Sequence, residues 1–212
     1  MAQKRTSGRS GPASGTRERM VAGAVDLLRR RGVTATSLRE VVRHTGTPRG
    51  SIAHHFPGGK AQLLEEAVDY ARRHVSRPLR DVLEAHGTIA GIRLLGRQWR
   101  ATLESTRFEA GCPVMAIAIE HAGDEASGGS DQLRLPGLAR EAFDDWVGLL
   151  AEALGRDGVA KARARSLAVL IVSSFEGAIG MSRAAHSCEP LERVLGELER
   201  AVAGALPAAR HG

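Results

Sequence analysis

The sequence predicts an all-α protein in which an N-terminal helix-turn-helix head is joined to a larger helical bundle. Apolar residues recur at helical spacing through most of the chain, and no run of alternating residues is long enough for a strand. Glycine and proline interrupt this pattern at intervals typical of helix ends. Apolar residues make up 42% of the 212 residues, which is enough for a packed core. We expect a helix-turn-helix domain over residues 16–62 and a bundle over residues 63–212.

The first 15 residues, MAQKRTSGRSGPASG, predict a disordered basic tail because glycine, serine and arginine dominate them. They contain no apolar segment of the kind found in signal peptides. The two cysteines, Cys112 and Cys188, form neither a disulfide framework nor a metal-ligand spacing. We therefore expect a cytoplasmic protein without a cofactor or a metal.

The positive charge is concentrated at one end of the chain. Residues 1–60 contain twelve basic and three acidic residues, whereas residues 61–212 carry a small negative charge. Most of the basic excess lies beyond the tail, in sequence that is expected to fold. This distribution predicts that the N-terminal quarter contacts an anionic partner such as DNA.

The head is expected to contain three short helices followed by a longer one. The first helix starts at Thr16 and stops at Gly32, and Thr36 is the expected N-cap of the second, SLREVVRH. After a break at residues 45–46, Thr47 is expected to cap a third helix with Pro48 at its first position. Residues 56–59 end that helix, and Lys60 opens the next one.

The rest of the chain predicts further helices, separated by glycine, proline and one polar loop. The most apolar run, residues 166–181, is interrupted by Ser173, Ser174 and Glu176 and is too short to cross a bilayer. We interpret it as a buried core helix and expect no membrane contact. The expected segments are residues 78–86, 88–106, 113–122, 133–154, 158–185 and 189–205.

The third helix has two different faces. At helical spacing Ile52 and Phe56 point inward with His55, whereas Arg49, Ala53 and His54 point outward. Gly50 and Ser51 are small enough to allow close approach to a DNA groove. The adjacent histidines cannot converge on one metal ion, because ligand pairs on a helix need a spacing of three or four residues. His54 is therefore expected either to contact DNA or to be an ordinary solvated side chain.

Lys60 is expected at the start of a helix, where a cation is disfavoured by the helix dipole. A bound DNA phosphate would reverse that effect, since the helix N–H groups and the ammonium would share one anion. The alternative is a solvated lysine that tolerates a small penalty. We favour the phosphate contact.

The segment SLREVVRHTGTPRGSIAHHFPGGKAQLLEEAV, residues 37–68, resembles the DNA-binding region of TetR-family transcriptional repressors. The stretches GCPVMAIAIE and FEGAIGMSRAAHSCEPLERV resemble the C-terminal region of the LmrA/YxaF-like subgroup. The resemblance implies a homodimer whose first helices bind an operator and whose remaining helices form an effector pocket and the dimer interface. The helices at 158–185 and 189–205 would pair across the two-fold axis.

By position, the resemblance implies DNA contacts at five residues. Bases or nearby phosphates would be contacted by Thr47, Arg49 and His54, and the DNA backbone by Thr36 and Lys60. Gly50 and Ser51 join the expected DNA-binding set because their small size allows close approach to the groove. The family usually has tyrosine where this chain has Ala53, so that tyrosine's phosphate contact is absent.

The resemblance also directs attention to apolar and aromatic residues of the bundle as a pocket for a small, largely apolar effector. Each of them could equally be plain core. The sequence therefore favours a dimeric repressor that an effector releases from a palindromic operator. The alternatives are a DNA-binding protein without sequence preference and, remotely, an enzyme that uses His54, His121 or Cys112. The pocket candidates are Trp99, Met115, Ile119, His121, Phe143, Trp146, Ser174, Phe175 and Met181.

Overall fold

The protein is represented by a computed structural model, which describes residues 14–120 and 134–207. Within these two ranges the chain forms helices and no strand, so the predicted all-α class is confirmed. His121 and most of the N-terminal tail lie outside the described residues. The helices are α1 (Ser14–Arg31), α2 (Leu38–Thr45), α3 (Ser51–His55), α4 (Gly59–Ser105), α5 (Pro113–Glu120), α6 (Arg134–Arg156), α7 (Lys161–Ala185) and α8 (Glu189–Ala203).

The caps of α2 and α3 differ from the predicted ones. Ser37, rather than Thr36, caps α2, because its hydroxyl accepts a hydrogen bond from the Glu40 amide at 3.2 Å. Gly46 ends α2 in the left-handed conformation, with φ 63°, as expected of a glycine after a helix. Thr47 does not cap α3, since residues 48–51 first form a turn in which the Ser51 amide donates to the Pro48 carbonyl.

A single long helix, α4, joins the two ends of the molecule. The prediction that a separate helix starts at Pro78 is wrong, because α4 continues through this proline. The predicted break at Gly87 is confirmed as a kink, with φ 76° and ψ −178°, a conformation that glycine adopts readily. Asp157 stabilises the kink by accepting a hydrogen bond from the Thr88 amide at 2.9 Å.

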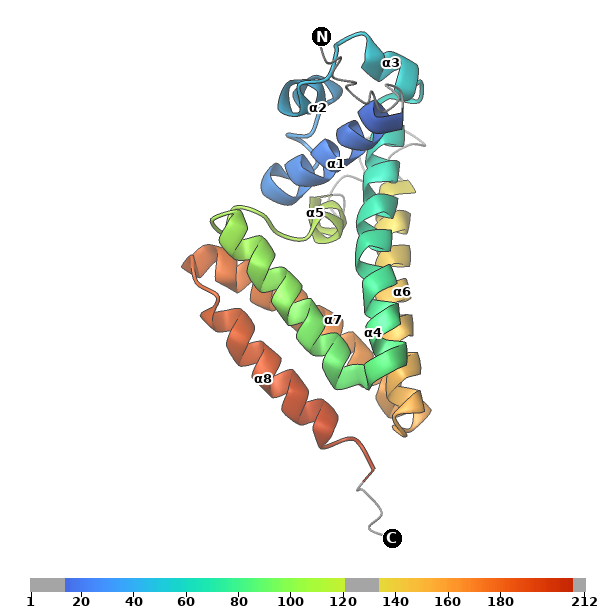
Figure 1. The fold of residues 1–212 in the computed structure, drawn as a ribbon, viewed down its shortest axis with the longest axis vertical. Coiled ribbons are helices and arrows are strands. Elements are labelled where there is room, and N and C mark those ends of the chain that lie inside the picture. Colours follow the sequence, from blue (N-terminus) through green and yellow to red (C-terminus); the bar gives the residue numbers. More distant parts are fainter. Residues whose placement is uncertain (1–13, 121–133, 208–212) are drawn as a thin grey trace, which may run out of the picture.

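Two hydrophobic clusters divide the core, and α4 contributes to both. One cluster joins α1–α3, the first part of α4, α5 and the start of α6, and the other joins the rest of α4 and α6 with α7 and α8. We call these two regions the head and the body (Figure 1). The expected boundary at residue 62 falls inside α4, whose apolar face continues from Leu63 to Ala71 within the head cluster.

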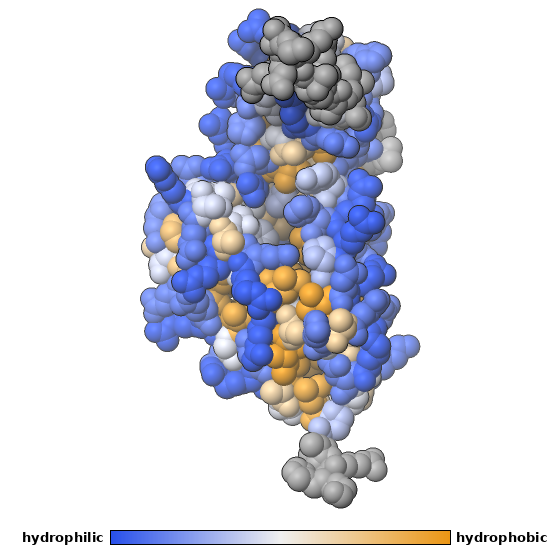
Figure 2. Space-filling view, viewed as in Figure 1, coloured by the Kyte–Doolittle hydropathy of each residue, from blue (hydrophilic) through white to orange (hydrophobic). Residues whose placement is uncertain are grey.

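The surface differs between the two regions. On the face shown in Figure 2, apolar residues gather over the body, whereas the described part of the head is mostly hydrophilic. By length and composition α7 could cross a membrane, but it packs against α6 and α8 as a core helix does. Its outer side nevertheless exposes Val169, Leu170 and Met181, which are 47%, 46% and 61% exposed.

Candidate DNA-binding surface

The inner side of α3 is fixed against the rest of the head. Phe56, directly after α3, is only 1% exposed, and the guanidinium carbon of Arg17 lies 5.3 Å from the centre of its ring. The same guanidinium donates to Glu66 of α4 at 2.6 Å. This contact therefore connects α1, the end of α3 and the start of α4, and it fixes which face of α3 points outward.

The outer side of α3 and the turn before it carries the exposed residues. Arg49, Gly50, Ala53 and His54 are all exposed, as the helical pattern predicts. Arg49 forms no salt bridge with any described residue, whereas Arg43 at the end of α2 is held by Glu40. The guanidinium fork of Arg49 is consequently available to an external hydrogen-bond acceptor.

The two threonines that were expected to contact DNA are both buried. Thr36 is 1% exposed, and its hydroxyl donates to the Gly32 carbonyl at 2.7 Å. Thr47 is 5% exposed, and its hydroxyl lies 2.9 Å from that of Thr45. Both side chains thus stabilise the turns on either side of α2 in this conformation. Ser51 is half-buried at the first position of α3.

Lys60 points back into the head. Its ammonium nitrogen donates to the carbonyl oxygen of Val33 at 2.8 Å. Partial burial lowers the pKa of Lys60, and the nearby Glu120 carboxylate opposes this shift. Glu120, the last residue of α5, accepts hydrogen bonds from the amides of Val33 and Thr34 at 2.9 Å each. The turn between α1 and α2 is therefore held from α4 and from α5 at once.

Arg39 was not among the predicted site residues. It is exposed on α2 and forms no salt bridge among the described residues, in contrast to Arg43 one turn later. Its position on the polar side of α2, opposite Val41 and Val42, was the sequence signal for an outward arginine. It adds a second free cation to the head surface.

The body encloses a small cavity of about 30 Å³ between α4, α6 and α7. Three of the predicted pocket residues line it: Trp99, Trp146 and Phe175. Glu176, which in the sequence interrupts an apolar run, is the one charged residue that the described part of the chain contributes to its wall. The remaining lining residues are Val75, Leu79, Leu95, Leu150, Ile171 and Val172.

The other described pocket candidates do not line this cavity. Ile119 and Met181 are 67% and 61% exposed, because each lies on the outer side of its helix. Phe143 packs edge to face against Trp146, with ring centres 5.5 Å apart, and is one layer removed from the cavity. Met115 and Ser174 are half-buried. α5 and α7 each carry apolar residues on a buried side and on an exposed side, and helical spacing alone could not show which side is buried.

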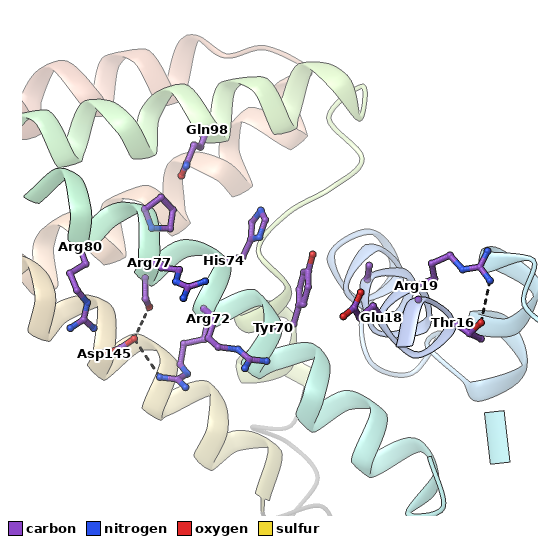
Figure 3. Close-up of a pocket in the computed structure, with 15 residues that line it drawn as sticks. Thr16, Glu18, Arg19, Tyr70, Arg72, His74, Arg77, Arg80, Gln98 and Asp145 are labelled. Atoms are coloured by element: carbon purple, nitrogen blue, oxygen red, sulfur yellow. Dashed lines mark hydrogen bonds and ion pairs between the residues drawn. The ribbon is translucent and has the colours of Figure 1, made fainter. Parts of the chain in front are cut away.

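A larger hollow of about 1340 Å³ lies open to solvent between the start of α1 and residues 70–80 of α4 (Figure 3). Its wall is rich in arginine. Arg72 is held by Asp69 at 2.8 Å, whereas Arg77 and Arg80 form no salt bridge among the described residues. An open basic groove does not suit a largely apolar ligand, so the cavity in the body is the better candidate for an effector site.

The comparison with protein families agrees with this arrangement of head and body. Residues 21–67 match the family model of bacterial regulatory proteins of the tetR family. Residues 88–197, more than half of the chain, match that of the transcriptional regulator LmrA/YxaF-like C-terminal domain. The chain belongs to the TetR family of transcriptional regulators. The DNA-binding match covers α2, α3 and the turn that connects them.

Individual TetR-family relatives support the assignment over nearly the full chain. An uncharacterized HTH-type transcriptional regulator of Mycobacterium tuberculosis is 44% identical over 196 residues, covering 91% of this chain and 97% of the relative. The HTH-type transcriptional regulator LmrA of Bacillus subtilis is 30% identical over 177 residues, covering 83% and 90%.

Solved TetR-family structures share the fold. A TetR regulatory protein from Rhodobacter sphaeroides superposes with a TM-score of 0.75 at 18% identity, covering 88% of this chain and 98% of that structure. A TetR regulator from Chloroflexus aurantiacus gives 0.68 at 26% identity, covering 92% and 97%. Since the family consists of transcriptional regulators and not of enzymes, the enzymatic alternative is excluded.

Proposed function

We propose that this TetR-family regulator is a cytoplasmic homodimeric repressor that a small, largely apolar effector releases from a palindromic operator. The observation that carries the DNA-binding part is the outward position of Arg49, in the turn before α3, and of His54 on α3, whose other face is fixed by Phe56. A recognition helix requires this division, because one side packs on the head while the other enters the major groove.

Within this proposal, Arg49 reads bases and His54 contacts a base or a nearby phosphate. Gly50 and Ser51 allow α3 to approach the groove wall closely. Thr36, Thr47 and Lys60 act mainly by holding the turns around α2 and α3, as their hydrogen bonds within the head suggest. Arg39 supplies an additional backbone contact. Ala53 offers no hydroxyl to a phosphate, so affinity depends more on the arginines.

The outer side of α7 supports a dimer. Exposed apolar residues lie there beside the small residues Ser173 and Gly177, a combination that permits close helix packing. Leaving Leu170 and Met181 in water would be unfavourable by about 25 cal/mol per Å² of apolar surface. We propose that α7 and α8 of two protomers form the interface, which spaces two α3 helices for the half-sites of one operator.

The route from effector to DNA runs through α4 and α5. α4 lines the cavity with Trp99 and also carries Lys60, which holds the turn before α2. α5 ends in Glu120, which holds the same turn from the other side. An effector that widens the cavity would displace α4 directly and α5 through its packing against α4 and α6. The separation of the two heads would then change, so that the effector binds better to the DNA-free conformation.

The test is selection of bound sequences from a random DNA pool, followed by transcription from a promoter that carries the selected site. A palindromic consensus, together with reduced transcription when the protein is added, is the expected result. Binding without sequence preference would favour the rival hypothesis of a nonspecific DNA-binding protein. Increased transcription would show an activator at that site.

A further inference from the structure

The cavity in the body contains a carboxyl group without a charged partner. Among the described residues that line the cavity, Glu176 is the only charged one, and the others are aliphatic or aromatic. Burial raises the pKa of Glu176 to about 7, and a hydrogen bond from the Cys112 thiol partly opposes this shift. Near pH 7 this carboxyl is thus about half ionised, and within the described ranges no cation lines the cavity to compensate its charge.

A second polar group lies in the same wall, and this one has no hydrogen-bond partner among the described residues. Trp146 is 6% exposed, and its indole N–H is buried without a hydrogen-bond partner among the described residues. Buried donors are almost always paired in folded proteins, so an unpaired one beside a cavity indicates a missing acceptor or a missing ligand. The cavity therefore has one acid and one donor available to an occupant.

A single water molecule would fit the cavity of about 30 Å³ and could bond to either group. It would leave the charge of Glu176 uncompensated. Aromatic rings bind a positive charge over their faces more readily than a negative one, and Trp99, Trp146 and Phe175 all line this cavity. A cation with apolar substituents matches both the carboxylate and the walls.

We propose that the body cavity binds an apolar molecule that carries a protonated nitrogen, with the Glu176 carboxylate as its ionic partner and the Trp146 N–H donating to an acceptor on the ligand or to a retained water. The inference rests on the proposed function only in treating this occupant as the effector. The cavity must widen to admit it, since its present volume holds little more than one water. The basic groove of Figure 3 would repel the same cation.

Three small cage compounds of similar shape test the proposal: adamantylamine, which is a cation, adamantanol, which is neutral, and adamantane carboxylate, which is an anion. The chain contains two tryptophans, and both line the cavity, so their fluorescence reports binding directly and without DNA. At pH 8 the amine should bind at least tenfold more tightly than the alcohol, and the carboxylate more weakly than both. Equal affinities, or no binding of the amine, would overturn the proposal.

The dependence on pH gives a second readout. The amine stays protonated from pH 6 to pH 8, while the ionised fraction of a carboxyl with a pKa of about 7 rises about tenfold, so the affinity should rise by about that factor. The other titratable group that faces Glu176 is the Cys112 thiol, whose pKa burial raises well above its usual value. The described residues of α4 and α6 contribute no titratable side chain to the cavity wall. The affinity of adamantanol should not change over this range.

The decisive variant is Glu176→Gln, which keeps the shape of the side chain and removes the charge. It should bind the amine and the alcohol equally well and lose the pH dependence. The matched control is Glu152→Gln, which changes an exposed glutamate of α6 and should behave as the unmodified protein does. A Glu176→Gln protein that still prefers the amine would contradict the proposal. Operator binding is measured separately: an amine that binds but does not release DNA supports the site and refutes the release mechanism.

Discussion

The ammonium nitrogen of Lys60 lies 2.8 Å from the carbonyl oxygen of Val33, so the first turn of α4 is bonded to the turn between α1 and α2. The amide of the same Val33 donates to Glu120 at the end of α5. Both backbone groups of one residue are thus engaged by side chains from two other helices. This arrangement makes the turn a junction of α1, α2, α4 and α5, and of these helices α4 also lines the body cavity.

Replacing Lys60 with methionine should destabilise the head more than it alters DNA recognition. Methionine keeps much of the apolar stem but leaves the Val33 carbonyl without its charged donor, a loss of about 1–3 kcal/mol. Urea unfolding measures the stability, and operator affinity across a salt series measures the phosphate contact. An unchanged stability together with a salt slope reduced by about one unit would instead identify Lys60 as the phosphate contact expected from the sequence.

Glu120→Ala should loosen the same turn from the other side. Two amides, those of Val33 and Thr34, would lose the carboxylate that accepts from them. Their hydrogen exchange should accelerate by about tenfold or more, since each lost charge-assisted bond corresponds to roughly 1.5–3 kcal/mol. Glu120→Gln, which keeps one acceptor oxygen, should have a smaller effect. Unchanged exchange at both amides would show that Glu120 does not hold the turn in solution.

Arg49→Ala should relax sequence preference at one position in each half-site. A bidentate arginine–guanine contact contributes about 1–3 kcal/mol of discrimination, and Arg49 is exposed without a salt bridge among the described residues. The measurement compares the affinity for the operator with that for single-base variants. Arg49→Lys retains the charge but lacks the fork, so it should lose discrimination while it retains most of the nonspecific affinity. A uniform loss for all sequences would make Arg49 a backbone contact.

Leu170→Glu should convert the proposed dimer into a folded monomer. Leu170 is 46% exposed in the protomer, so the glutamate is tolerated by a single chain but would be buried unpaired in an α7 interface. Sedimentation measures the mass, and operator affinity should fall strongly because one head binds only one half-site. Ile119→Glu places the same charge at an exposed apolar residue of α5 and should leave the mass unchanged. A dimeric Leu170→Glu protein would locate the interface elsewhere.

The sequence predicted the helical segments well because glycine, proline and apolar spacing mark helix ends directly. It could not predict that α4 continues through Pro78, since the helix is supported there by packing of Leu79 and Leu83 in the body core. The apolar pattern of α7 also could not separate its core side from its exposed side. Ile171 and Ala178 are 0% and 1% exposed and belong to the core, whereas their neighbour Leu170 faces outward.

The outward residues of α3, by contrast, could be predicted from the sequence. A short amphipathic helix has only two faces, and the position of Phe56 decides which one is buried. The inward turn of Lys60 was not predictable, because its partner is a backbone carbonyl 27 residues away. In the sequence Glu176 only interrupts an apolar run, because a single sequence does not show that residues from three helices surround it.

The contribution of Glu176 to the stability of the protein should fall as the pH rises from about 4.5 to about 7, because its carboxyl ionises in this window. Its pKa in the folded protein is about 7, compared with 4.5 for an unperturbed glutamate, so the folded state binds more protons than the unfolded state in this window. Each unit of difference between the two pKa values corresponds to 1.36 kcal/mol, which gives a loss of about 3 kcal/mol across the window and no further change above it.

Glu176→Gln should remove this slope and be the more stable protein at pH 8, because its amide carries no charge to bury. Urea unfolding at matched protein concentration and at several pH values measures the difference, with Glu152→Gln as the control that should follow the unmodified protein. Parallel curves for all three proteins would mean that Glu176 ionises with an ordinary pKa, and its side chain would then have to be well solvated in the folded state.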